Sequence, residues 1–164
     1  MHECRSQGNK EGDEEMKLGR TRTLRGQITV VGGVGRKNII VSDGLVNLGL
    51  LIKKFQVWET ILPNGTGNRF HTAILSLDTI SSGSAMNAGD NRQFAWAMSS
   101  VNGTDGNIIQ PYTIIDPDHI VNRDLFLTFT DTTNATYNYL IEAQVVELTD
   151  DEAIITIIKE TSQS

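Results

Sequence analysis

The hexapeptide LFLTFT, residues 125–130, decides the fold class because its side chains alternate. Leu125, Leu127 and Phe129 would share one face of an extended strand, and two threonines would lie on the other face. The pentapeptide FAWAM, residues 94–98, alternates large and small side chains in the same way. An alternating pattern of this length predicts a β-strand with one face against a hydrophobic core.

Short runs of this kind recur along the chain and are separated by turn-forming residues such as Gly32-Gly33 and Pro63-Asn64-Gly65. The runs that we expect to be strands are 24–31, 38–41, 50–59, 70–78, 93–99, 108–115, 124–130 and 137–148. Regularly spaced short strands with few helical segments are typical of antiparallel sandwiches and barrels. We therefore predict an all-β protein, an antiparallel, jelly-roll-like β-sandwich of about eight strands.

The end of the chain breaks the β pattern. TDDE at 149–152 has the spacing of a capping box, with Thr149 as N-cap and Glu152 at the third helical position. The following segment carries Ile154, Ile155, Ile157 and Ile158, which form an apolar stripe on a short helix. A helix of this length does not fold alone. Its stripe packs either against its own sheet or against another subunit, and Ile154, Ile155 and Ile158 are candidate interface residues.

Length and composition predict one folded domain. The chain has 164 residues, of which 38% are hydrophobic, enough to fill one core. We expect a disordered polar leader at 1–19, a β-sandwich domain at 20–148 that includes a basic arm, and a helix and tail at 149–164. The leader lacks the apolar region of a secretory signal, so we expect no secretion by a signal peptide and no membrane partner. The single cysteine, Cys4, excludes an intrachain disulfide.

The net charge of −6 conceals a segregation of charge. The segment 16–42 carries six basic residues and no acidic one, whereas 43–164 carries six basic and fifteen acidic residues. The six basic residues are Lys17, Arg20, Arg22, Arg25, Arg36 and Lys37. They are candidates for contact with the acidic body of a neighbouring subunit or with nucleic acid phosphates. The plain alternative is a solvated strand with arginines on its exposed face.

The glycine-rich stretch VVGGVGRKNII, residues 30–40, is not a phosphate-binding loop. A Walker loop requires Gly-Lys followed by Ser or Thr, and a dinucleotide loop requires a third glycine and then a helix. Here Gly35 is followed by Arg36, and the β-branched residues after it indicate a strand. We predict a glycine-rich hairpin bend that carries two surface cations, and no cofactor.

Candidate catalytic residues are few. There is no G-x-S-x-G motif, and an enzyme would require His71, His119, Asp78 and Asp118 to converge. We therefore expect no enzymatic activity.

The densest polar cluster, DPDH at 116–119, makes Asp116, Asp118 and His119 weak candidates for a metal site. Its spacing matches no complete metal loop, so an Asp-Pro turn in which the carboxylates accept backbone N–H groups is the preferred interpretation.

Two tryptophans, Trp58 and Trp96, lie in predicted strands. Each has two interpretations: packing in the core or at an edge, or a role at an interface or in stacking on a ligand.

Four stretches carry a resemblance to a known group of proteins. They are GRKNIIVSDGLVNLGLLIKKFQVW, DNRQFAWAMSS, DPDHIVNRDLFLTF and YNYLIEAQVVELTDDEAIITIIKE, and the resemblance spans roughly 20–160. In overall pattern they resemble small β-rich structural proteins of the virions of environmental and marine viruses. The resemblance implies a capsid-like sandwich subunit located in the virion and assembled in the host cytoplasm. The acidic leader departs from the basic arm of a typical capsid protein.

Two functions follow from these features. The first is a self-assembling virion subunit, a homo-oligomeric capsid or capsid-associated protein. Its partners would be copies of itself and other virion proteins, with nucleic acid as a further candidate for the basic arm. The alternative is a β-sandwich binding module that holds carbohydrate or a receptor through its loops, with a tryptophan as the stacking platform.

Overall fold

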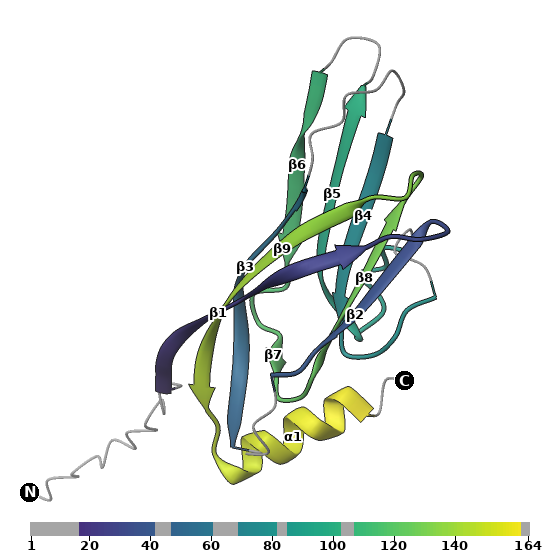
Figure 1. Cartoon of the computed structure of the whole chain (residues 1–164). Helices are drawn as coiled ribbons and strands as arrows, with labels where there is room; N and C mark the ends of the chain where they lie inside the picture. Colours follow the sequence, from purple (N-terminus) through teal and green to yellow (C-terminus); the bar gives the residue numbers. More distant parts are fainter. Residues whose placement is uncertain (1–16, 42–46, 61–68, 82–84, 103–106, 162–164) are drawn as a thin grey trace, which may run out of the picture.

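The structure, a computed structural model, describes residues 17–41, 47–60, 69–81, 85–102 and 107–161. Within these ranges the chain forms antiparallel strands and one C-terminal helix (Figure 1). The strands are β1 (Lys17–Thr29), β2 (Val34–Ile39), β3 (Leu48–Glu59), β4 (Arg69–Ser76), β5 (Gln93–Asn102), β6 (Asn107–Ile115), β7 (Ile120–Val121), β8 (Leu125–Asp131) and β9 (Thr136–Glu147). The helix is α1 (Asp150–Thr161). The predicted all-β class is therefore confirmed.

The strands form two sheets with a nested pairing. One sheet has the order β1-β9-β3-β7, and the other has the order β2-β8-β4-β5-β6. The pairs are nested along the chain: β1 pairs with β9, β2 with β8, β3 with β7, and β4 with β5. This order arises when a long antiparallel hairpin rolls up into two facing sheets, as in a jelly roll. The strand β6 extends the second sheet beside β5 and forms its edge.

The core lies between the sheets and is built by alternation. The predicted alternating strand β8 turns Leu125, Leu127 and Phe129 inward, and all three are fully buried. They meet inward-facing residues of the other sheet, including Phe55 and Ile141. Successive side chains of a strand point to opposite faces, so the alternation along a strand determines which of its faces meets the core.

The observed strands differ most from the predicted ones at three places. Strand β1 begins at Lys17, so the structure places residues 17–19, predicted to lie in the leader, in the sandwich. Strand β2 begins at Val34, four residues before the predicted start. The short strand β7 was not predicted, because two residues give no periodic signal. The rest of the predicted leader, residues 1–16, lies outside the described residues.

The glycine-rich bend between β1 and β2 is confirmed, but it is not a simple hairpin. Gly32 and Gly33 have φ angles of 65° and 89°, which favour glycine, and a bridge joins Val31 to Val34 around them. Beyond this bridge, β1 and β2 enter different sheets. The bend therefore carries the chain from one layer of the sandwich to the other.

The predicted capping box begins α1. The backbone N–H of Thr149 donates to Glu152 Oε2 at 2.8 Å, and the backbone N–H of Glu152 donates to Thr149 Oγ1 at 3.3 Å. The two bonds satisfy backbone donors that a helix start leaves without intrahelical partners. Figure 1 shows the helix lying across one end of the sandwich, opposite the end to which β5 points.

Candidate assembly surfaces

The helix α1 is attached to the sandwich by a small contact. Ala153 is 3% exposed and packs with Leu51, Val146 and Leu148. Of the helix side chains that the structure describes, Ala153 alone is buried. The amphipathic helix therefore uses little of its apolar surface in holding itself to its own sheet.

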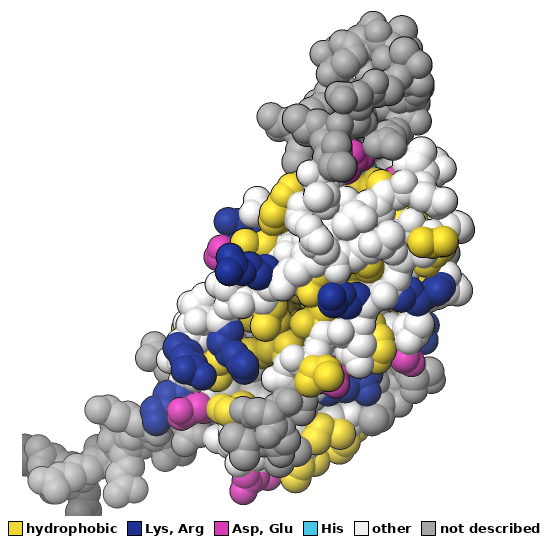
Figure 2. Space-filling model, viewed as in Figure 1, with side chains coloured by type: hydrophobic (Ala, Val, Ile, Leu, Met, Phe, Trp, Pro, Cys, Tyr) yellow, Lys and Arg dark blue, Asp and Glu magenta, His cyan; other side chains and the backbone are white. Residues whose placement is uncertain are grey.

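The predicted isoleucine stripe faces away from the sandwich. Ile154 and Ile155 are 55% and 52% exposed, and Ile157 and Ile158 are 38% and 56% exposed. Figure 2 shows hydrophobic side chains at this end of the molecule, where α1 lies in Figure 1. Exposed apolar side chains that gather on one short helix offer a surface on which a partner can dock. The stripe was expected to pack either against its own sheet or against another subunit. Ile154 and Ile155 do not pack against their own sheet.

The predicted basic arm divides into two groups. The first group lies on β1, which forms an edge of its sheet and, among the strands that the structure describes, pairs with β9 alone. Lys17 contacts Glu147 at 3.3 Å, and both side chains are well exposed. Arg20, Arg22 and Arg25 make no hydrogen bond or ion pair within the described part of the chain. Figure 2 shows basic side chains collected over the first half of this strand.

The second group, on β2, is engaged within the chain. Arg36 donates from Nε to the carbonyl oxygen of Ile80 at 3.0 Å and from Nη2 to that of Ser81. Lys37 Nζ donates to the carbonyl oxygen of Gln27 at 3.3 Å and lies 5.9 Å from the ring centroid of Tyr139. Burial raises the pKa of Tyr139. Lys37 thus links the two edge strands β1 and β2. We assign Arg36 and Lys37 a structural role, because both bind backbone carbonyl groups of the same chain.

The two tryptophans occupy different environments. Trp58 lies on the outer face of β3 and is 47% exposed. Trp96 is 9% exposed and packs with Ile74 and Ile80 on the outer face of the other sheet. Of the two interpretations, packing fits Trp96. The exposed face of Trp58 is available to a partner.

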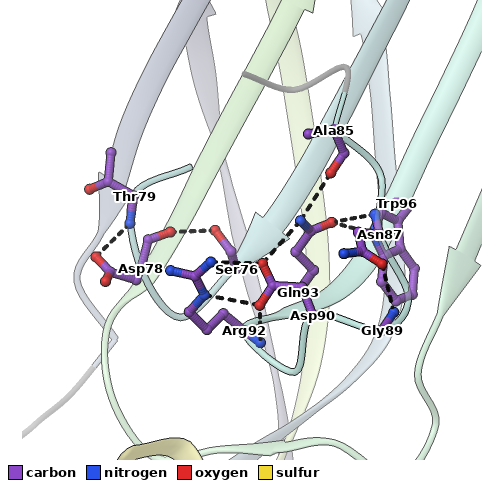
Figure 3. Close-up of polar contacts among 10 residues, drawn as sticks. All are labelled: Ser76, Asp78, Thr79, Ala85, Asn87, Gly89, Asp90, Arg92, Gln93 and Trp96. Carbon is purple, nitrogen blue, oxygen red and sulfur yellow. Dashed lines mark hydrogen bonds and ion pairs between the residues drawn. The ribbon is translucent and has the colours of Figure 1, made fainter. Parts of the chain in front are cut away.

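Trp96 is held by a polar network in the segment that follows β4 (Figure 3). Its Nε1 donates to Gln93 Oε1 at 2.8 Å, and Gln93 Nε2 donates to the carbonyl oxygen of Ala85 at 3.0 Å. Nearby, Arg92 donates two hydrogen bonds of 2.9 Å to Asp90. These bonds lower the pKa of the Asp90 carboxyl. The network holds this segment over the sheet and covers Trp96.

The candidate metal residues form the predicted turn. The backbone N–H of Asp118 donates to Asp116 Oδ1 at 3.1 Å. His119 turns away and stacks on Phe94 with ring centroids 4.8 Å apart. Burial lowers the pKa of His119, and the charge of Asp116 offsets this only in part. Among the described residues, no three ligating side chains come together at a possible metal site.

A buried polar cluster closes the other end of the core. His71, Ser99 and Asp131 are neighbours in one row across β5, β4 and β8. Ser99 Oγ is hydrogen-bonded to His71 Nε2, and Tyr137 from the facing sheet donates to Asp131. Asp131 also accepts a 2.9 Å bond from Thr133 Oγ1. The sequence held a signal for this cluster, because the alternation of β8 continues to Asp131 and predicts an inward carboxylate.

An enzyme would need His71, Asp78, Asp118 and His119 to converge, and of these four residues this cluster contains His71 alone. Of these, His71 lies at the start of β4, and Asp78 follows the end of the same strand, about 20 Å further along. Among the described residues, no hydrogen bond or ring contact joins any two of Asp78, Asp118 and His119.

Comparison with known proteins gives no relative: no protein-family profile, curated protein or solved structure matches this chain. Within the parts of the chain that the structure describes, no helix combines the length and the hydropathy needed to cross a bilayer.

Proposed function

We propose that this chain is a non-enzymatic structural subunit of a virion, a capsid or capsid-associated protein that assembles with copies of itself and with other virion proteins. The observation that carries the proposal is the exposed isoleucine stripe of α1. The four isoleucines leave the equivalent of about two whole side chains exposed, and covering them would contribute roughly 3–6 kcal/mol before the costs of association.

The fold supports this function by analogy. Viral capsid domains commonly use the jelly roll, although lectins and other proteins use it as well. The sandwich also offers edge strands on which an assembly can be built. The resemblance of the sequence to virion proteins points in the same direction.

The proposal is tested by light scattering of the purified chain at low and high salt, with negative-stain microscopy of the same fractions. We expect regular rings or shells whose mass falls as the salt concentration rises. A monomer of 18.1 kDa under all conditions would exclude the function.

A carbohydrate-binding function is a second candidate because of Trp58. In the register of the sheet, Trp58 stands beside Asn138, whose side-chain oxygen accepts a 3.0 Å hydrogen bond from Gln27 Nε2. An exposed aromatic ring beside amide groups suits stacking on a sugar. Glycan-dependent quenching of tryptophan fluorescence in a monomeric sample, lost in Trp58→Ala, would favour this function.

A further inference from the structure

The arginines of β1 and the start of α1 carry opposite charges at the same end of the molecule. Lys17 stands opposite Glu147 in the register of β1 and β9, and α1 begins three residues later at Asp150. The first turn of α1 holds Asp150, Asp151 and Glu152, and all three are exposed. No described hydrogen bond or ion pair joins these acids to Arg20 or Arg22 of the same copy.

Charge determines which partner the free edge of β1 accepts. An edge strand can pair with a strand of another copy. Pairing of β1 with β1 would bring the arginines of the two copies together, and like charges opposite one another destabilise a sheet. The basic edge is therefore complementary to an acidic partner and repels the β1 edge of another copy.

The surface of β1 also has an apolar part. Leu18 is 54% exposed and lies between Lys17 and the arginines. On α1, the exposed isoleucines follow directly after the acidic turn. Each surface thus has a charged part beside an apolar part, with opposite charges on the two surfaces.

We infer that α1 of one copy docks on the first half of β1 of a second copy. The isoleucines cover Leu18 and the strand around it, and the carboxylates of Asp150 and Asp151 face Arg20 and Arg22. The inference rests on the proposed assembly function and names its interface. A reciprocal contact closes a dimer, whereas a one-way contact propagates to a ring or a filament.

A charge-swap experiment tests the inference. One variant carries Asp150→Lys and Asp151→Lys, and the other carries Arg20→Glu and Arg22→Glu. Each variant alone places like charges at the interface, so we expect its self-association to weaken roughly tenfold or more in sedimentation velocity. In an equimolar mixture, each helix meets a complementary strand on the other variant, and we expect association to recover.

Recovery on mixing is also the folding control, because two misfolded proteins would not restore association. Circular dichroism of each variant and the milder Asp151→Lys variant extend this control. Lys53→Glu reverses an exposed cation on β3 and should associate like the unmodified chain. If both charge-swap variants and their mixture also associate like the unmodified chain, the inference is wrong and the assembly function stands. If the unmodified chain does not associate, the assembly function itself fails.

Nucleic acid is the competing partner for the arginines. Binding to a fluorescein-labelled single-stranded oligonucleotide is measured by anisotropy at several salt concentrations. We expect no difference between the Arg20→Glu, Arg22→Glu variant and the unmodified chain. Loss of oligonucleotide binding in this variant, with self-association unchanged, would assign the basic edge to phosphates and overturn the inference.

Discussion

Replacing Ile154 and Ile155 by serine should weaken self-association while leaving the folded monomer intact. About half of each side chain is exposed, and fully burying an isoleucine contributes roughly 1.5–3 kcal/mol. Covering the exposed halves of the two side chains therefore contributes roughly 1.5–3 kcal/mol per helix. Each 1.4 kcal/mol corresponds to a factor of ten, so we expect the Kd to rise by about 10- to 100-fold for each helix that docks.

The monomer should tolerate the same change. Serine and isoleucine have similar helix propensities, and exposed substitutions usually change the free energy of unfolding by less than about 0.5 kcal/mol. The assays are sedimentation velocity over a concentration series and thermal unfolding of the dilute protein. The matched control is Ile40→Ser, because Ile40 is 76% exposed and lies outside α1.

Two outcomes would refute this reasoning. If the Kd of the double serine variant equals that of the unmodified chain, the stripe does not contribute to assembly. If Ile40→Ser weakens association as much as the double variant does, the effect comes from general surface hydrophobicity and not from the helix.

Three further predictions concern stability. Glu152→Ala removes the acceptor of the 2.8 Å bond from Thr149 and should cost α1 roughly 0.5–2 kcal/mol, seen as lost helical circular dichroism; an equal loss in Asp151→Ala would contradict the capping role. Gly35→Ala would place a Cβ 2.8 Å from the carbonyl oxygen of Thr29 and should lower the free energy of unfolding in urea by about 1–3 kcal/mol; unchanged stability would show that the two edge strands separate easily. Burial lowers the pKa of His119 below 6.5, so the unfolded chain binds its proton first as the pH falls. Stability should therefore decline as the pH drops through about 6.5 and level off below the folded-state pKa, and His119→Gln should remove this part of the decline, whereas an unchanged pH profile would assign it to other groups.

The features that could be predicted from the sequence are those with a local cause. The capping box of α1 depends on four consecutive residues, and the structure confirms it. The inward face of β8 depends on alternation along one strand. Even the inward carboxylate of Asp131 follows from that alternation, although its partners His71 and Tyr137 come from distant strands.

The features that could not be predicted depend on contacts between distant segments. The start of β1 is polar, and residues 17–23 become a strand because β9 pairs with them. Arg36 and Lys37 are surface cations, as predicted. The hydrogen bond from Arg36 to the carbonyl oxygen of Ile80 could not be predicted, because Ile80 lies 44 residues away along the chain. The different exposure of Trp58 and Trp96 likewise depends on the segment after β4, which covers only one of them.

The central claim is that the isoleucine stripe of α1 is an assembly surface, and hydrogen exchange tests it most directly. Backbone exchange of residues 153–158 is compared in dilute and concentrated samples whose mass is followed by light scattering. We predict that exchange in α1 slows as the mass rises, because docking covers a helix that its own sheet leaves exposed. A rising mass with unchanged exchange in α1 would contradict the claim and place the assembly contacts elsewhere.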